Sequence, residues 1–180
     1  MVDAVVVDTN VLIVASAADD GSPFQPGATP VQERTLRQMV LDWLRAFEGD
    51  SSRHAVIDWD WHVCSEYQNK LSDQDYGWLA LMAKRDRNEV VWVGLTIDQH
   101  GHAVLPTQLA AAVTDLADRK MVAAVLAAKD LGHNACLVNA CDTDWLECAD
   151  ALKAFGIPVT QILEAWLIAK WTAKGKATKP

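Results

Sequence analysis

Short apolar runs that alternate with longer stretches of helical periodicity constrain the fold of this chain most strongly. Residues 4–8 form the clearest run: they are too few and too rich in β-branched side chains for a buried helix, which is typical of a buried strand. Strand-like segments at 54–58, 89–95, 135–140 and 157–161 are separated by predicted helices. This alternation predicts a three-layer α/β domain with a mainly parallel central sheet.

One domain is expected from the length of the chain. With 180 residues it is long enough for a single sizeable core, and it contains no internal repeat. We assign residues 1–173 to this domain and interpret the lysine-rich residues 174–180 as a disordered tail. Around residues 89–105, the turn at His100-Gly101 predicts a β-hairpin insert.

The charge of the chain argues against broad electrostatic attraction to nucleic acid but does not exclude a nuclease. The formal net charge is −8, and an acidic surface repels phosphate. A bound metal ion would offset part of that charge at a site. Basic residues also cluster at 84–87, at Arg119-Lys120 and near the C-terminus at Lys170, Lys174, Lys176 and Lys179, although each cluster is also typical of a solvated helix face.

The sequence indicates neither a membrane protein nor a disulfide framework. No apolar run approaches the ~20 residues of a membrane span, and the N-terminus lacks the basic segment of a signal peptide. The four cysteines form no C-x-x-C pair, and the only close histidine pair, His100 and His102, lies in a turn-like segment, which disfavours zinc. We therefore expect a cytoplasmic protein with free thiols.

Four acidic residues carry the candidate chemistry: Asp8, Glu66, Asp118 and Asp142. Asp8 closes the first strand, and Asp142 follows the strand at 135–140. Glu66 and Asp118 belong to predicted helices that can reach the same edge of the sheet, and this is the edge at which parallel α/β sheets bind ligands. Clustered carboxylates repel one another unless a cation neutralises them, and oxygen ligands select Mg²⁺ or Mn²⁺. The residues therefore predict a metal-dependent hydrolase.

The segments around these acids resemble, in the same order, the motifs of PIN-domain nucleases. They are 5–12 with V-V-V-D-T-N-V-L, 65–71 with S-E-Y-Q-N-K-L, 118–124 with D-R-K-M-V-A-A, and 137–145 with L-V-N-A-C-D-T-D-W. The likeness departs at Asn139-Ala140-Cys141, where the family more often has a threonine. It implies a Mg²⁺- or Mn²⁺-dependent endoribonuclease of the toxin type, with RNA as substrate and an antitoxin protein as a partner.

Residues beside the four acids have further candidate roles. Asp144, two residues after Asp142, matches the paired acids of the family, and it either binds metal or caps the helix that follows. Thr9 and Asn10 are expected to orient the site from the first turn of their helix. The reserve candidates for metal binding are Asp115, which competes with Asp118, and Asp58. The weaker candidates for contact with substrate are Arg119, Lys120 and Trp145.

Self-association is a further expectation. The last predicted helix carries an apolar stripe made of Leu163, Trp166, Leu167 and Trp171. This stripe either pairs two copies of the chain, as the resemblance implies, or covers the sheet of its own domain.

Other functions fit parts of the same pattern. A haloacid-dehalogenase-type phosphatase also begins with an acid at a strand end, but it needs a second Asp where Asn10 stands. A response-regulator receiver domain needs a different layout of acids. A catalytically weak RNA-binding or regulatory module on the same fold stays open, as does another metal-dependent phosphatase.

Overall fold

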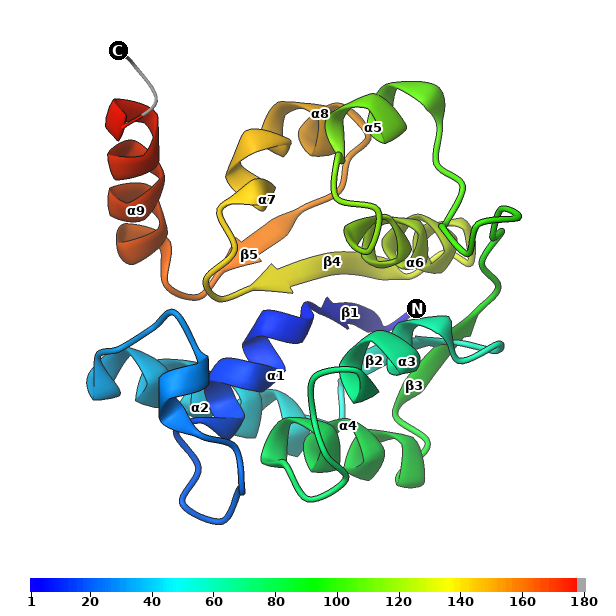
Figure 1. Cartoon of the computed structure of the whole chain (residues 1–180). Helices are drawn as coiled ribbons and strands as arrows, with labels where there is room; N and C mark the ends of the chain where they lie inside the picture. Colours follow the sequence, from blue (N-terminus) through cyan, green and yellow to red (C-terminus); the bar gives the residue numbers. More distant parts are fainter. Residues whose placement is uncertain (178–180) are drawn as a thin grey trace.

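Five parallel strands form the central sheet of residues 1–177, the part of the chain that the computed structural model describes (Figure 1). They are β1 (Asp3–Val7), β2 (Arg53–Asp58), β3 (Val90–Val93), β4 (Asn134–Asn139) and β5 (Val159–Gln161), in the order β3-β2-β1-β4-β5. All neighbouring pairs are parallel. The prediction of a three-layer α/β fold with a mainly parallel sheet is therefore confirmed.

Strand β1 lies in the middle of the sheet and is buried on both faces. Val5 pairs with Ala55 of β2 and with Cys136 of β4. The four residues 4–7 are at most 2% exposed. Because water reaches neither face, the strand carries apolar side chains at successive positions instead of alternate ones.

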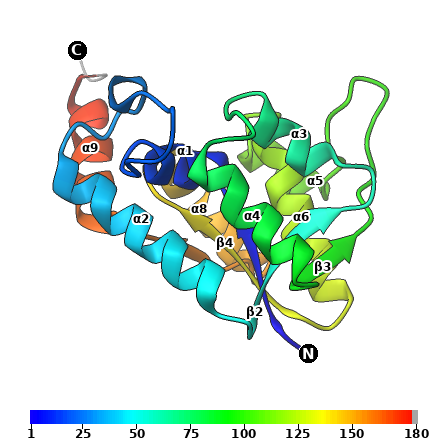
Figure 2. The same ribbon diagram turned by 90° about the horizontal axis from the view of Figure 1, so that it is seen from below.

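Helices cover both faces of the sheet. On one face, α1 (Thr9–Ser16) packs against α2 (Arg34–Gly49) and α4 (Tyr76–Asp86) (Figure 2). On the other, α6 (Asp118–Asp130) packs on β1 and β4 (Figure 1). The remaining helices are α3 (His62–Gln68), α5 (Thr107–Ala112), α7 (Asp144–Glu147), α8 (Ala149–Ala154), α9 (Glu164–Ala177) and the short 3₁₀ helix η1 (Pro26–Ala28).

The strand order reverses between β1 and β4. From β1 the chain passes to β2 and β3 on one side, and it then crosses to the other side of β1 for β4 and β5. The segments after β1 and β4 leave the sheet toward opposite faces, α1 on one and α7 on the other (Figure 1). Ligands of parallel α/β sheets bind in the crevice at such a reversal. Asp8 follows β1 and Asp142 lies shortly after β4, so both residues are at this point.

Close helix packing holds α1 against α4. A Cβ added at Gly77 of α4 would lie only 2.6 Å from the carbonyl oxygen of Leu12 in α1, so any larger residue would push the helices apart. The backbone N–H of Gly77 also donates to Oγ of Ser16 at 2.9 Å. Helix α1, which begins beside Asp8, is thereby fixed relative to the sheet edge.

The predicted hairpin and tail differ from the observed structure. Residues 90–93 form the edge strand β3 of the central sheet. The hairpin that follows is reduced to a single antiparallel bridge between Ile97 and Ala103. Helix α9 continues to Ala177, so residues 174–177 of the predicted tail are helical, whereas residues 178–180 lie outside the described residues.

Within the predicted basic cluster at 84–87, Lys84 has a structural role. Lys84 is fully buried, and its ammonium donates to the carbonyls of Asp50 and Arg53 and to Oε2 of Glu89. The lysine thus joins the end of α4 to the segment that leads into β2. Its charge is used inside the fold.

Helix α9 uses part of its apolar stripe to cover its own domain. Leu163 and Leu167 are buried, 3% and 0% exposed. Ile168 and Trp171 stay half-exposed, at 48% and 44%. Neither α9 nor any other helix in the described part of the chain is both long and apolar enough to cross a membrane.

Candidate metal centre

Asp8 is held at the junction of β1 and α1 by bonds to both of its carboxylate oxygens. Its backbone N–H donates to the carbonyl of Val138 at 2.9 Å, which continues the pairing of β1 with β4. Oδ1 caps α1 by accepting from the backbone N–H of Asn10 at 2.9 Å. Oδ2 accepts from the indole Nε1 of Trp145 at 2.5 Å. The residue is only 5% exposed, and these two donors set the orientation of its carboxylate.

Asp142 is positioned by two asparagines that join α1 to the loop after β4. Oδ1 of Asn10 accepts from the backbone N–H groups of Ala140 and Cys141, at 2.8 and 3.2 Å. Nδ2 of Asn10 donates to Oδ1 of Asn139 at 2.9 Å. Asn139 in turn accepts from the backbone N–H of Asp142 at 3.0 Å and donates to its carbonyl at 2.8 Å. The prediction that Asn10 orients the site agrees with these bonds.

Asn139 was not among the predicted site residues, although the sequence carries a signal for it. It ends the apolar strand β4 and is fully buried. A buried amide needs hydrogen-bond partners, so a polar residue at the end of an apolar strand indicates a fixed network. Asn139 also donates to Oε1 of Gln161 at 2.6 Å and thereby ties the loop to β5.

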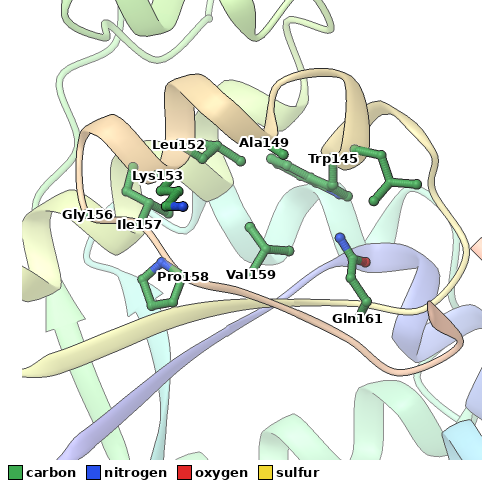
Figure 3. Close-up of a pocket in the computed structure, with 10 residues that line it drawn as sticks. Trp145, Ala149, Leu152, Lys153, Gly156, Ile157, Pro158, Val159 and Gln161 are labelled. Atoms are coloured by element: carbon green, nitrogen blue, oxygen red, sulfur yellow. The ribbon is translucent and has the colours of Figure 1, made fainter. Parts of the chain in front are cut away.

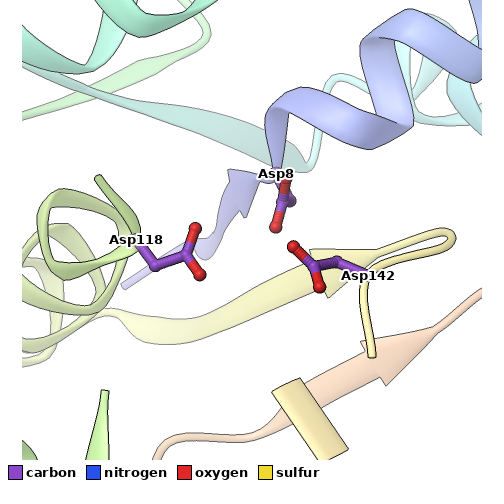
Figure 4. Close-up of side chains that lie close together, drawn as sticks. All are labelled: Asp8, Asp118 and Asp142. Carbon is purple, nitrogen blue, oxygen red and sulfur yellow. The ribbon is translucent and has the colours of Figure 1, made fainter. Parts of the chain in front are cut away.

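Three aspartates from three different elements meet at the reversal of the strand order. Asp118 is the first residue of α6, which packs over β1 and β4. Its carboxylate points toward those of Asp8 and Asp142 (Figure 4). One oxygen atom from each of the three lies within 4.8 Å of the others. The tertiary structure thus brings together three of the four acids that the sequence singled out.

The chemistry of these donors fits a hard divalent cation. All three side chains offer carboxylate oxygens, the ligand type that Mg²⁺ and Mn²⁺ take. Oxygens bound to one octahedral Mg²⁺ lie roughly 3 Å apart when adjacent and roughly 4 Å apart when opposite, since each is about 2.1 Å from the ion. Small shifts of the carboxylates would bring all three into that range.

The electrostatics of the cluster disfavour three negative charges in the absence of a cation. Burial, opposed by bonds from Asn10 and Trp145 and reinforced by the charge of Asp142, raises the pKa of Asp8 to about 7. Burial and the charges of Asp8 and Asp142 raise the pKa of Asp118 to about 8. Burial also raises the pKa of Asp142. A cation would reverse these shifts by stabilising the ionised carboxylates.

Glu66 lies at the rim of the cluster and not within it. It lines the same cavity as Asp8, Asp118 and Asp142, which has a volume of about 220 Å³. Its Oε1 forms an ion pair with the ammonium of Lys120. Glu66 is therefore placed to hold Lys120 beside the aspartates, and the three-carboxylate cluster forms without it.

Asp144 is the first residue of α7, whereas the residue that caps a helix lies one position before its start. The N-cap residue is Thr143, and its side chain makes no capping bond. The backbone N–H of Asp144 donates to Oδ1 of Asp142 at 2.9 Å, so it supports a predicted metal ligand. Its own carboxylate lies 3.9 Å from the ammonium of Lys174. The expectation that Asp144 caps this helix is therefore wrong.

The two reserve acids have local structural roles. Oδ1 of Asp115 accepts from the backbone N–H of Ala117 at 2.8 Å, in the turn that leads into α6. Asp58 is fully buried, and its two oxygens accept from the backbone N–H groups of His62 and Val63 at 2.9 and 2.7 Å. Neither acid belongs to the cluster of three.

Of the three candidates for substrate contact, Trp145 and Arg119 have structural roles, and Lys120 is the one left available. Trp145 is 1% exposed and bonded to Asp8, so the prediction that it stacks on a base is wrong. The guanidinium of Arg119 donates to the carbonyls of Val113 and Ala110 at 3.1 and 2.7 Å and so braces the approach to α6. Lys120 is paired with Glu66, which lines the cavity of the aspartates, and Thr9 lines the same cavity.

A second and larger cavity lies on the other side of Trp145. It has a volume of about 540 Å³ and is enclosed by α7, α8 and β5 (Figure 3). Its walls are mainly apolar, including Leu152, Ile157 and Val159. The ring of Trp145 therefore contacts this cavity while its Nε1 holds Asp8.

No family model, no curated protein and no solved structure matches this chain. The chemistry of the site is therefore inferred from its own residues and their geometry.

Proposed function

We propose that the protein is a divalent-metal-dependent nuclease that hydrolyses phosphodiester bonds of RNA. The observation that carries this proposal is the meeting of Asp8, Asp118 and Asp142, with one oxygen of each within 4.8 Å of the others, at the reversal of the strand order. One buried and two partly buried carboxylates at such short distances need a cation to be charged together. A site of this kind at the ligand-binding edge of a parallel sheet is suited to phosphoryl chemistry.

Asp8, Asp118 and Asp142 would hold the ion. When bound, such an ion supplies Lewis-acid activation of a phosphate and lowers the pKa of an attacking water. Trp145 orients the carboxylate of Asp8, and Asn139 holds the backbone of Asp142, so two of the three ligands are set in place before metal binds. Such preorganisation reduces the reorganisation that binding and catalysis require.

Lys120 supplies a positive charge at the rim. Its ammonium is paired with Glu66, which lines the cavity of the three aspartates together with Lys70. A phosphate that enters this cavity can share that ammonium, which would offset part of the repulsion between the substrate and the acidic cluster. Asp8 and Asp142 would then face the reacting phosphate, with Lys120 at its edge.

The choice of RNA rests on the sequence. The segments around the four acids resemble those of toxin-type PIN ribonucleases, which favours RNA over other phosphodiesters. The same resemblance supports an antitoxin protein that would block the site. A haloacid-dehalogenase-type phosphatase is disfavoured, because Asn10 occupies the position of its second acid and is engaged by Asn139, Ala140 and Cys141.

RNA cleavage by the purified protein tests the proposal. Single-stranded RNA should be cut in Mn²⁺ or Mg²⁺ and stay intact in EDTA. Asp118→Asn should reduce cleavage by about two orders of magnitude, whereas Asp115→Asn, which alters an acid outside the cluster and preserves its local turn, should cut nearly as well as the wild type. Cleavage that persists in EDTA, or an Asp118→Asn variant with wild-type activity, would contradict it. Turnover of a phosphomonoester without any RNA cleavage would favour the phosphatase.

A further inference from the structure

A cavity of mixed polar and apolar lining beside the three aspartates contains two lysines of α9. It has a volume of about 290 Å³ and is enclosed by α1, the segments 28–30 and 141–143, and α9. It shares Asn10 and Asp142 with the cavity that holds the aspartates, so the two cavities are neighbours. We call it the α9 cavity.

The two lysines reach this cavity from adjacent turns of one helix. Lys170 and Lys174 are four residues apart on α9 and therefore share a face. The ammonium of Lys170 lies 4.5 Å from the centroid of the Trp166 ring, a cation–π contact that positions it. The ammonium of Lys174 donates to Oγ1 of Thr143 at 2.6 Å, next to Asp142.

Two lysines in one cavity stand out against the charge of the whole protein, even with Asp142 in the same lining and the Asp144 carboxylate 3.9 Å from the Lys174 ammonium. The chain has a net charge of −8, and three carboxylates meet in the neighbouring cavity. A nucleic-acid strand would be repelled by such a surface unless its flanking phosphates met cations close to the site. Lysines that are already held in place bind a phosphate at a lower entropic cost than freely moving ones.

We propose that the α9 cavity binds, through Lys170 and Lys174, the phosphate next to the scissile one in a single-stranded RNA. This inference rests on the proposed function, because the aspartates define which phosphate is cleaved. Asn10 and Thr143 also line this cavity, but their side chains are engaged by Asn139, Ala140, Cys141 and Lys174, so the two ammonium groups are the donors left to a phosphate. The ligand is therefore a phosphodiester chain of at least two linkages, and not a single phosphate group.

Steady-state kinetics with two substrates test this arrangement. The first is a dinucleoside monophosphate, which has only the scissile phosphate, and the second is a trinucleoside diphosphate, which also has its neighbour. Lys170→Gln/Lys174→Gln should raise KM for the longer substrate roughly tenfold, with kcat within about threefold of the wild type. The shorter substrate should be unaffected. Lys153→Gln, which removes an exposed lysine from the opposite cavity, is the matched control and should leave both KM values unchanged.

Binding without cleavage provides an independent measurement. Fluorescence anisotropy of a labelled single-stranded RNA, with Ca²⁺ in place of Mn²⁺ and the RNA checked to be intact, gives Kd over a range of salt concentrations. The slope of log Kd against log salt should fall by about 0.7 for each phosphate contact that the double variant loses. Inorganic phosphate and a nucleoside monophosphate should compete only weakly. Lys170→Gln alone, which leaves the bond between Lys174 and Thr143 intact, carries the test if the double variant fails to fold.

The outcomes separate this inference from the proposed function. Metal-dependent cleavage with unchanged KM, Kd and salt slope in the double variant would overturn the phosphate site and leave the nuclease intact. Three further results would also overturn it. They are an equal rise in KM for the dinucleoside monophosphate, an equal rise in KM in the Lys153→Gln control, and effective competition by free phosphate. RNA binding that depends on both lysines in a protein that never cleaves RNA would reject the nuclease and, with it, the position next to a scissile phosphate, leaving only a phosphate-binding α9 cavity.

Discussion

The indole Nε1 of Trp145 donates a hydrogen bond to Oδ2 of Asp8, across 137 positions of the chain. The other oxygen of Asp8 accepts from the backbone N–H of Asn10. Both oxygens of this carboxylate therefore face N–H donors from the protein. The need to keep both of these N–H donors paired decides which substitutions at Asp8 or Trp145 the site can tolerate.

Asp8→Asn should abolish most activity while changing stability in a pH-dependent way. Loss of a metal ligand should lower activity by at least about two orders of magnitude, or roughly 3 kcal/mol of transition-state stabilisation. An amide can accept from Asn10 or from Trp145 but not from both, so one donor is left unmatched at a cost of about 1–3 kcal/mol. At pH 8 in EDTA, relief of carboxylate repulsion should offset that cost. At pH 5, where the wild-type carboxyl is already neutral, the variant should be clearly less stable.

Urea unfolding in EDTA at the two pH values measures this difference, beside RNA cleavage in Mn²⁺. An Asp8→Asn protein that is active, or one that is destabilised more at pH 8 than at pH 5, would show that Asp8 serves only as a helix cap.

The metal-free protein should lose stability as pH rises from about 5 to about 8. The pKa of Asp8 is raised to about 7 and that of Asp118 to about 8, both from an ordinary 3.8. The folded state therefore binds these protons more tightly than the unfolded state. Their contribution is fully present below about pH 4 and is lost as pH rises through the raised values. The expected loss is on the order of 5 kcal/mol for the two groups together.

Unfolding in EDTA and in saturating Mn²⁺, measured over the same pH range, checks this prediction. Mn²⁺ should remove the decline, because it displaces the protons and binds more tightly as pH rises. Asp118→Asn should flatten the curve in EDTA. A metal-free stability that increases between these pH values would contradict the assignment of the cluster.

Trp145→Phe should shift the pH dependence of activity without removing the site. The change keeps an aromatic ring in the core and deletes the Nε1 donor to Asp8. Because that bond lowers the pKa of Asp8, its loss should raise this pKa further and move the acidic limb of kcat/KM to higher pH. Activity at pH 7 should fall by about tenfold. Trp171→Phe on the exposed face of α9 is the control, and an identical pH profile in the two variants would argue against a positioning role.

Asn139→Asp should destabilise the protein by about 2–4 kcal/mol. The new carboxylate would be fully buried and would face the carbonyl of Asp142 and Oε1 of Gln161 without a proton to donate. The same substitution at the exposed Asn69 should change stability by no more than about 0.5 kcal/mol. Chemical denaturation of both variants tests this, and equal stabilities would mean that the network around β4 does not hold the site.

Self-association through α9 stays a prediction that can be measured directly. Leu163 and Leu167 are buried in their own domain, so the surface left for a second copy is centred on Ile168 and Trp171. Light scattering at tens of micromolar should give the mass of a dimer, and Trp171→Glu should give a monomer. A wild-type mass equal to that of one chain would favour the alternative, in which α9 only covers its own sheet.

The sequence alone determined the strands and the edge at which the chemistry lies. The apolar run at residues 4–8 indicates a strand that is buried on both faces, because a central parallel strand contacts helices above and below it. Parallel strands end at one edge, so the pattern of strands is enough to place Asp8 and Asp142 together. Likewise, Asp118 at the start of a helix was expected to reach that edge, and it does.

Only the tertiary structure decided which polar groups meet. Glu66 pairs with Lys120, Trp145 with Asp8 and Asn139 with Asn10, over separations of 54, 137 and 129 residues. Hydrophobic periodicity indicates whether a position faces the core, and strand order indicates which strand ends lie next to each other in the sheet. Neither specifies the rotamer or the hydrogen-bond partner of a polar side chain. These depend on distances of a few tenths of an ångström between elements far apart in the chain, which are set only when the whole core has packed.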